Sequence, residues 1–352
     1  MRRTSRQLRI GKVTVGGDAP IAVQSMTKTD TRDTHATIDQ IKELDDCGCE
    51  IVRLAVPDRE AAESLAIIKK SVSLPIIADI HFDYGLALGA LKAGADGLRL
   101  NPGNIGDREQ IARVVAAAKE RQVPIRIGIN AGSLPPDFHP RTPLARRMVN
   151  MALQHIKLME SLDFDLIKVS LKAFDVPTTI QAYQSIADKT HYPLHLGITE
   201  AGLPGTGAIR SAVGIGILLH QGIGDTIRVS LTAHPCEEVF VGYEILKSLG
   251  LRQRGPTLVS CPSCGRAEVD IIALAEAVNE RLAKMSKPIK VAVMGCVVNG
   301  PGEARDADVG IAGGKGKGAI FRKGRVVGTV SEDKLLAAIM AEVNSVTKKG
   351  TE

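Results

Sequence analysis

The sequence predicts a TIM-like (β/α)8 barrel followed by a small α+β domain. Short runs of aliphatic and β-branched residues recur eight times before residue 232, and helical apolar spacing fills many of the stretches between them. Eight such repeats are typical of a barrel, whose functional residues lie at the carboxyl ends of its strands. An open doubly wound sheet is the alternative, but the first strand–helix turn lacks the glycine-rich dinucleotide fingerprint.

The repeats define a first domain over residues 1–250. A short hairpin over 10–17 precedes the first strand. The expected strands are Ala22–Met26, Ile51–Val56, Ile76–Ile80, Gly97–Asn101, Ile125–Asn130, Leu166–Leu171, Leu194–Glu200 and Thr226–Leu231. Helical spacing marks, among others, Ala61–Ser71, Tyr84–Ala93, Arg108–Arg121, Met148–Ser161, Thr178–Lys189 and Ala208–Gln221.

A linker over 251–256 leads to a second domain, residues 257–352. Its expected helices are 269–283 and 332–343, and its expected strands are Thr257–Ser260, Ile289–Met294, Val309–Ile311, Ala319–Arg322 and Arg325–Thr329. The lysines of 314–318 lie among glycines, as in a phosphate-binding loop. The full P-loop pattern is not met, so we expect a hairpin tip there.

Composition narrows the class of function. Aromatic residues make up 3% of the chain and Trp is absent, which argues against stacking on nucleic-acid bases. The net charge of +6 suits a polyanionic small molecule as well as a nucleic acid. No apolar run approaches the roughly 20 residues of a membrane span, and the basic start lacks a signal peptide's apolar stretch. We expect a cytoplasmic protein.

Five expected strands carry a cation within an otherwise apolar run. A buried cation is costly unless it is paired, and the acids in comparable positions are few. We therefore expect an uncompensated ring that binds a multiply charged anion such as a diphosphate, because guanidinium groups match phosphate oxygens two at a time. The cations are Arg53, Arg99, Arg126, Lys168 and Arg228, and the same strand faces carry Asn130, Ser170, Lys172 and Ser230.

Two carboxylates close strands of the same barrel. Asp79 and His81 end the third strand and Glu200 ends the seventh, so the carboxylates serve either proton transfer or orientation of the cations. His81 is as well explained by a capping role. The glycine-rich segment 202–207 is either a phosphate-binding loop or a tight turn before a helix.

Three cysteines of the second domain indicate a metal centre. Cys261 and Cys264 share one tight loop and Cys296 lies on another. A structural zinc ribbon needs four strong ligands, and Cys296 lacks a nearby Cys or His partner. An iron–sulfur cluster with Glu303 as a displaceable oxygen ligand is the preferred interpretation. Cys47 and Cys49 are expected to be buried small hydrophobes, and Cys236 to be structural. Disulfides are not expected, because cytosolic thiols are kept reduced.

The anion site of the barrel and a cluster with one displaceable ligand can act on the same substrate only if the two domains come together. The short linker leads to the hypothesis of a homodimer in which each cluster domain caps the partner's barrel.

Motifs along nearly the whole chain resemble the 4-hydroxy-3-methylbut-2-en-1-yl diphosphate synthase family of the methylerythritol phosphate route to isoprenoids, in its compact bacterial form. The matching segments are 11–17, 23–27, 78–82, 99–104, 128–134, 196–202, 260–266 and 294–303. The last two together are highly specific.

The resemblance implies a [4Fe–4S] cluster on Cys261, Cys264, Cys296 and Glu303. The substrate would be 2-C-methyl-D-erythritol 2,4-cyclodiphosphate, reduced with two electrons from flavodoxin or ferredoxin. The five cations with Asn130 and Ser230 would hold the diphosphate. Asp79 and Glu200 would manage protons, and Asn299 would orient the substrate. The family is also dimeric.

Two rival functions remain open on the residues alone. One is a zinc-dependent or metal-free barrel lyase acting on a phosphorylated sugar, with a structural cysteine knuckle. The other is a basic nucleic-acid-binding protein with a zinc ribbon, which would need exposed cations and aromatic platforms.

Overall fold

The chain folds into two compact units in the computed structural model, Met1–Arg252 and Gln253–Glu352. The structure describes residues 2–100, 107–135, 141–283, 285–296, 302 and 304–349. No helix among these residues is long and apolar enough to cross a membrane.

The first unit is a barrel of eight parallel strands, as predicted. They are β3 (Ala22–Met26), β4 (Ile51–Ala55), β5 (Ile76–Asp79), β6 (Gly97–Leu100), β7 (Ile125–Asn130), β8 (Ile167–Lys172), β9 (His195–Leu196) and β10 (Thr226–Ile227). Neighbours pair in the order β8-β7-β6-β5-β4-β3-β10-β9, and one bridge between Val169 and Leu194 joins the two ends. The last two strands are shorter than predicted, because the chain after Leu196 leaves the ladder and reaches a left-handed conformation at Glu200.

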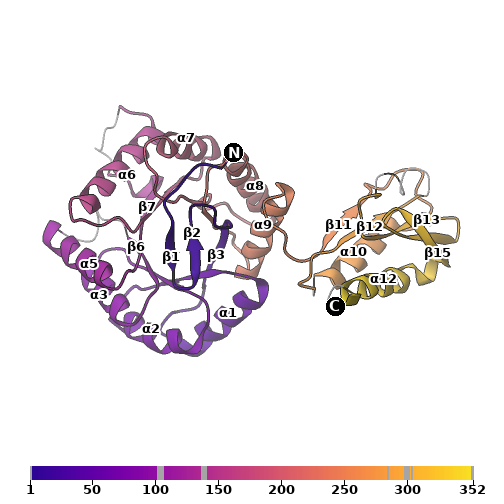
Figure 1. The fold of residues 1–352 in the computed structure, drawn as a ribbon, viewed down its shortest axis with the longest axis horizontal. Coiled ribbons are helices and arrows are strands. Elements are labelled where there is room, and N and C mark those ends of the chain that lie inside the picture. Colours follow the sequence, from indigo (N-terminus) through magenta and orange to yellow (C-terminus); the bar gives the residue numbers. More distant parts are fainter. Residues whose placement is uncertain are drawn as a thin grey trace. The chain divides into compact units, whose positions relative to one another are not determined.

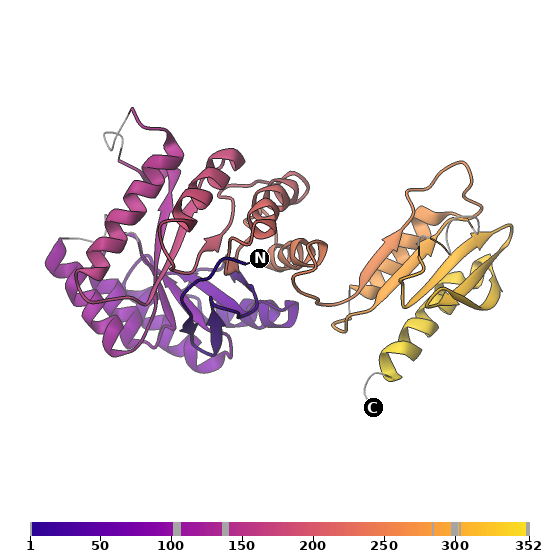
Figure 2. The same cartoon turned by 45° about the horizontal axis from the view of Figure 1, so that its top comes forward.

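Eight helices of the described chain surround the strands (Figures 1 and 2). They are α1 (Thr34–Cys47), α2 (Arg59–Ser71), α3 (Tyr84–Lys92), α5 (Arg108–Glu120), α6 (Leu144–Glu160), α7 (Val176–Ala187), α8 (Pro204–His220) and α9 (Pro235–Ser248). Aspartates cap the amino ends of α1, α2, α3, α5 and α7 by accepting a backbone N–H, which fixes where each helix begins. The glycine-rich segment 202–207 is not a free loop, because α8 already begins at Pro204.

The predicted hairpin plugs the amino-terminal end of the barrel. Strands β1 (Leu8–Ile10) and β2 (Val13–Val15) pair antiparallel and lie across the strands in Figure 1. Leu8, Ile10 and Val15 form a small core with Ala22, Ile51 and Ile77, which lie at or next to the starts of β3, β4 and β5.

The prediction that disulfides are absent was wrong. Cys47, at the end of α1, is bonded to Cys236, in the first turn of α9, with a Cα–Cα distance of 5.8 Å. The pairing of β3 with β10 makes α1 and α9 neighbours, so residues 189 apart in sequence meet. Cys49 is buried and free, as predicted, whereas Cys47, which we expected to be buried as well, is exposed.

The second unit is a five-stranded sheet covered by helices. The strands β11 (Thr257–Ser260), β12 (Lys290–Met294), β13 (Val309–Gly314), β14 (Lys317–Arg322) and β15 (Arg325–Ser331) lie in chain order. Helices α10 (Ile271–Leu282) and α12 (Leu335–Lys349) share one apolar core with the sheet. The tip between β13 and β14 carries the lysines, as predicted for a hairpin. Because β11 and β12 are parallel neighbours, their carboxyl ends lie side by side.

Candidate functional site

The predicted cations come together inside the barrel. Arg99, Arg126 and Lys168 are buried, and the side chains of Arg53 and Arg228 are only 12% and 13% exposed. Register places Arg99 beside Arg126 and Arg126 beside Lys168. Burial, together with the charges of Arg53 and Arg99, keeps the pKa of Arg126 well below its ordinary value. Such mutual repulsion is the electrostatic signature of a site for an anion.

Lys172 stands among these arginines, although the sequence prediction placed Lys168 in the ring. It ends β8, and its Nζ lies 3.4 Å from Nε2 of His195. The pKa of Lys172 lies well below its ordinary value, chiefly because the side chain is buried. The neighbouring charges of Arg126, Arg228, Arg53 and Arg99 lower it further. The rule that barrel sites occupy carboxyl strand ends would have selected Lys172 over Lys168, which lies four residues earlier.

Lys168 occupies a deeper position on the same strand face. Burial, and then the charge of Arg126, lowers its pKa, whereas Asp225 raises it. Asp225 directly precedes β10, at the amino-terminal end of the barrel. Lys168 therefore lies between the charges of the two barrel ends.

Two glycines make room for the cations. A Cβ at Gly128 of β7 would lie 2.6 Å from Nε of Arg99, and one at Gly197 would lie 2.6 Å from Nζ of Lys172. Real Cβ atoms do not approach other atoms so closely, so neither strand could carry a side chain there without moving a cation. At both glycines a cationic side chain therefore packs directly against the backbone.

Asp79 is the counter-ion of the ring. Its carboxylate lies 3.5 Å from Nε of Arg53 and accepts a hydrogen bond from Arg99 at 3.1 Å. Burial alone would raise its pKa, but Arg53, a hydrogen bond with His81 and the charge of Arg99 hold the pKa of Asp79 well below its usual range. A carboxyl group that stays ionised is a poor proton donor, which favours the orienting alternative for Asp79. A cavity of about 300 Å³ opens beside Asp79 and His81.

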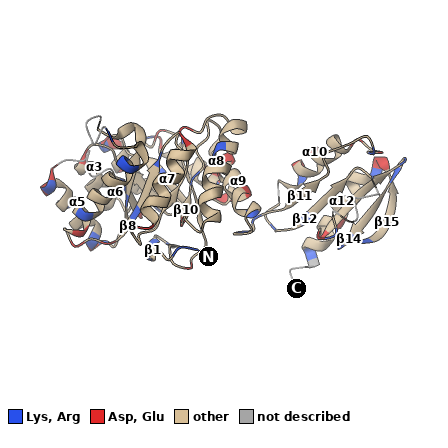
Figure 3. Cartoon of the chain, turned by 90° about the horizontal axis from the view of Figure 1, so that it is seen from above, with Lys and Arg blue, Asp and Glu red and all other residues tan. Residues whose placement is uncertain are grey.

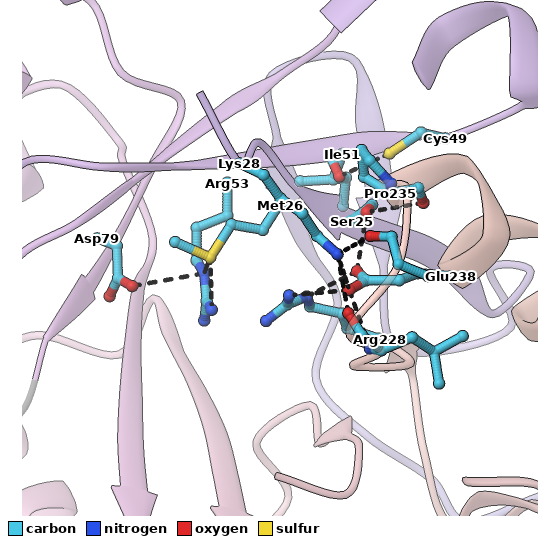
Figure 4. A network of polar contacts seen from close by, with 12 residues as sticks. Ser25, Met26, Lys28, Cys49, Ile51, Arg53, Asp79, Arg228, Pro235 and Glu238 are labelled. Atoms are coloured by element: carbon cyan, nitrogen blue, oxygen red, sulfur yellow. Dashed lines mark hydrogen bonds and ion pairs between the residues drawn. The ribbon is translucent and has the colours of Figure 1, made fainter. Parts of the chain in front are cut away.

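Glu238 is a second counter-ion, which the sequence reasoning missed. It is 1% exposed in α9 and lies 3.3 and 3.4 Å from two nitrogens of Arg228 (Figure 4). It also accepts hydrogen bonds from Ser25 Oγ at 3.1 Å and from the backbone N–H of Leu231 at 3.1 Å, and Lys28 Nζ lies 3.6 Å away. Its position, ten residues after Arg228 in a helix, gave no signal in the sequence.

The other predicted residues lie at carboxyl strand ends. Asn130 ends β7, and Ser230 follows β10 two residues after Arg228; both are half-buried. Glu200 is exposed, with a φ of 54°. A left-handed conformation costs a non-glycine residue on the order of 1 kcal/mol and is frequent at functional sites.

The cysteine loops of the second unit leave adjacent strand ends. Cys261 follows β11 and Cys296 lies just after β12, and both are free thiols. The backbone N–H of Gly295 donates to Cys261 Sγ at 3.2 Å, as amides do toward the sulfurs of thiolate-bound metals. Within the described residues no three potential ligands are gathered closely enough to hold a metal ion. The predicted Asn299 and Glu303 lie outside the described residues.

Charges on the outside are mixed. In the view of Figure 3, basic and acidic residues are interspersed over the outer helices of the first unit. The cations that the sequence predicts to bind an anion lie inside the barrel.

Comparison with known proteins yields one family for both units. The GcpE TIM-barrel domain model matches residues 5–243, and the GcpE protein C-terminal domain model matches residues 257–345. Curated relatives named 4-hydroxy-3-methylbut-2-en-1-yl diphosphate synthase (flavodoxin) include one from Dehalococcoides mccartyi, 65% identical over 98% of this chain and 99% of its own. One from Geobacter sulfurreducens is 59% identical with the same coverage.

Solved structures agree on the barrel alone. A dihydropteroate synthase from Stenotrophomonas maltophilia matches with a TM-score of 0.55 at 14% identity, covering 70% of this chain and 98% of that one. A Yersinia pestis dihydropteroate synthase matches with a TM-score of 0.51 at 13% identity, covering 69% and 97%. At these identities the likeness concerns the fold.

Proposed function

The chain belongs to the GcpE family, and we propose that it makes 4-hydroxy-3-methylbut-2-en-1-yl diphosphate, the product for which its curated relatives are named. It is an oxidoreductase of isoprenoid biosynthesis. The substrate would be 2-C-methyl-D-erythritol 2,4-cyclodiphosphate. Two electrons and two protons open the ring and remove one oxygen as water, which leaves the allylic diphosphate.

One observation carries this proposal: the barrel interior holds buried cationic donors in excess of their acceptors. Among the described residues, Nε of Arg99, Nε and a terminal nitrogen of Arg126, and Nζ of Lys168 have no hydrogen-bond partner. Unsatisfied buried donors are costly, and the costs of several repelling cations add to them. A diphosphate would supply both the acceptors and the opposite charge.

The residues of the barrel would divide the work of binding. Arg53, Arg99, Arg126, Lys172 and Arg228, with Asn130, Ser230 and the deeper Lys168, would hold the diphosphate. Asp79 and Glu238 would position the arginines, because each accepts from or pairs with them. Glu200, with its exposed side chain at the end of the seventh repeat, would transfer the proton.

A [4Fe–4S] cluster would supply the electrons when bound. The predicted ligands are Cys261, Cys264 and Cys296. The donor set fits the cluster, since Cys261 and Cys296 are free and the Cys261 sulfur accepts a backbone N–H. We propose Glu303 as the fourth, displaceable ligand and Asn299 as a residue that orients the substrate.

Assembly and surroundings complete the proposal. Flavodoxin, which the relatives' names contain, would be the electron donor, with ferredoxin as the alternative. Exposed apolar side chains follow three barrel strands, Phe82, Phe174 and Leu203, and the outer side of α8 exposes Ile209, Val213 and Ile217. We assign these surfaces to a cytoplasmic homodimer in which the cluster domain of one copy caps the barrel of the other.

The test begins with anaerobic purification, iron and sulfide analysis and a visible absorption spectrum. We expect brown protein with about four irons per chain, bleached by dithionite or air, and turnover of the cyclic diphosphate with reduced flavodoxin. Colourless protein that contains one zinc and is indifferent to oxygen would contradict the proposal and favour the barrel lyase.

A further inference from the structure

The first and last helices of the barrel are joined by the one covalent cross-link among the described residues. Cys47 ends α1 and Cys236 lies in the first turn of α9, and their disulfide closes a loop with a sequence separation of 189. These helices follow β3 and β10, the two strands whose pairing joins the start of the barrel to its end. The disulfide thus spans the seam where the barrel closes.

The surroundings of this pair suit both of its redox states. The Glu43 carbonyl lies 3.5 Å from Cys236 Sγ, where it can accept a hydrogen bond from the reduced thiol. His234 Nε2 lies 3.3 Å from Glu43, and Tyr243 Oη donates to the Gly48 carbonyl at 2.9 Å, so other contacts hold the two helices together when the disulfide is open.

The pair is also accessible, whereas its neighbour is not. Cys47 is exposed and Cys236 is half-buried. Cys49 lies two residues from Cys47 but is 3% exposed, and burial raises the pKa of its thiol to about 12. Thiol–disulfide exchange needs an accessible sulfur and a thiolate, so Cys49 is inert and serves as a built-in control.

We propose that Cys47 and Cys236 are a reversible redox modification site, which exchanges with low-molecular-weight thiols and disulfides and locks the barrel seam when oxidised. The two thiols lose two electrons and two protons, and one molecule of the small disulfide is reduced to two thiols. Disulfides in reducing compartments are usually transient or redox-sensing, which accords with a reversible bond on an exposed surface.

The disulfide is connected to the anion site through the first turn of α9, which contains both Cys236 and Glu238. Ser25 of β3 donates to Glu238, which holds Arg228, and its Oγ also lies 3.4 Å from the Pro235 carbonyl, next to Cys236. Oxidation would therefore restrain the helix turn that positions Arg228; the importance of that restraint for substrate rests on the proposed function, but the exchange itself does not.

The experiment equilibrates the full-length holoprotein anaerobically in mixtures of reduced and oxidised glutathione. Free thiols are trapped with N-ethylmaleimide and located by peptide mass spectrometry. We expect Cys47 and Cys236 to convert together between two alkylated thiols and one cross-link, in both directions, while Cys49 does not change. Alkylation of both in every mixture, a cross-link that never opens, or glutathione retained on Cys47 alone would each overturn the proposal.

Thermal unfolding and hydrogen exchange test the lock. The oxidised form should unfold roughly 5–15 °C higher than the reduced form, because the cross-link restricts the unfolded chain. Cys47→Ser and Cys236→Ser should each behave like the reduced protein in either buffer, and Cys49→Ala should keep the redox dependence. Amides in the first turn of α9 should exchange more slowly when oxidised than when reduced, with α5 as the reference helix. Equal protection of α9 in both forms would refute the lock, whether or not the enzyme turns over the cyclic diphosphate.

Discussion

The two ends of the barrel each contain a buried carboxylate, but their charge balance differs. At the amino-terminal end, Asp225 accepts hydrogen bonds from Arg2, Ser5 and the backbone N–H of Leu194. Arg3 pairs with it more loosely, at 3.9 Å, and donates to backbone carbonyls. At the carboxyl end, Asp79 and Glu238 face Arg53, Arg99, Arg126, Lys172 and Arg228.

The comparison teaches that burial of charge alone does not identify a functional site. Both ends bury ionised groups, and all three carboxylates are about as deeply buried as the hydrophobic core. At the amino-terminal end, Arg2 and Arg3 have carboxylate or carbonyl partners, and each leaves one buried nitrogen unsatisfied. At the carboxyl end, Arg126 bonds the neutral Ser170 hydroxyl and leaves two buried nitrogens without a partner, and Arg99 leaves one. An unmatched set of buried charges, not a buried charge as such, indicates where a ligand binds.

The largest expected effect is that of Lys172→Met. Removing the cation in the middle of the ring should weaken the binding of substrate about 100-fold or more, while stability stays equal or rises, because a buried, repelled ammonium is replaced by an apolar chain of similar length. Substrate titration by calorimetry and urea unfolding measure the two. Lys168→Met is the matched comparison, because it removes the deeper lysine of the same strand face and should weaken binding less. An equal loss in the two variants would contradict the larger role given to Lys172.

At the opposite end, Asp225→Asn should lower the free energy of unfolding by about 3 kcal/mol, because it leaves Arg2 and Arg3 without their carboxylate. The KM for the substrate should not change. Urea unfolding followed by circular dichroism is compared with Asp165→Asn, whose pair with Arg6 is exposed and should contribute less than about 1 kcal/mol. A change in KM with unchanged stability would reverse the roles of the two ends.

Asp79→Asn tests the counter-ion of the ring through pH. The folded-state pKa of Asp79 is lowered, so its contribution to stability is complete above the ordinary carboxyl pKa of about 3.9 and is lost as the pH falls through the folded value. The variant should be less stable than the parent by about 2 kcal/mol at pH 6–8, and the difference should shrink below about pH 4. A difference that stayed constant as the pH fell would show that Asp79 has an ordinary pKa in the folded protein, and one that grew as the pH fell would show a raised pKa.

The smallest expected effect is that of Glu238→Gln. The amide keeps the shape but loses the charge that holds Arg228, so KM should rise about tenfold, or 1.4 kcal/mol, with kcat nearly unchanged. Glu237→Gln, on the exposed neighbour, is the control. In Arg228→Met the substitution at Glu238 should have little further effect on KM; additive losses would mean that Glu238 does not act through Arg228.

Much of this arrangement could be predicted from the sequence, because strand–helix repeats and polar residues at strand ends follow from local periodicity. The barrel, the plugging hairpin and the burial of Arg99, Arg126 and Lys168 were of this kind. The Cys47–Cys236 bond could not be predicted, because it depends on β3 meeting β10, a contact between residues some 200 positions apart. Glu238 was missed for another reason: it lies in a helix after the strand, and helical spacing does not show which residue faces Arg228. Alternation along β8 put Lys168 and Lys172 on one face but did not rank them by depth, so Lys172 as a ligand of the anion is a proposal from the structure.

The plug at the amino-terminal end also constrains the order in which the chain can fold. Arg3 donates to the carbonyls of Ala187 and Tyr192, its own N–H donates to Gly222, and Ser5 donates to Asp225. This amino-terminal segment therefore binds partners that are synthesised about 200 residues later. During synthesis this amino-terminal segment remains exposed, and loop-closure entropy makes the final docking slow. A nascent chain halted before residue 226 lacks β10, the strand that closes the barrel. Translation must therefore pass that residue before the amino-terminal segment can dock against the barrel.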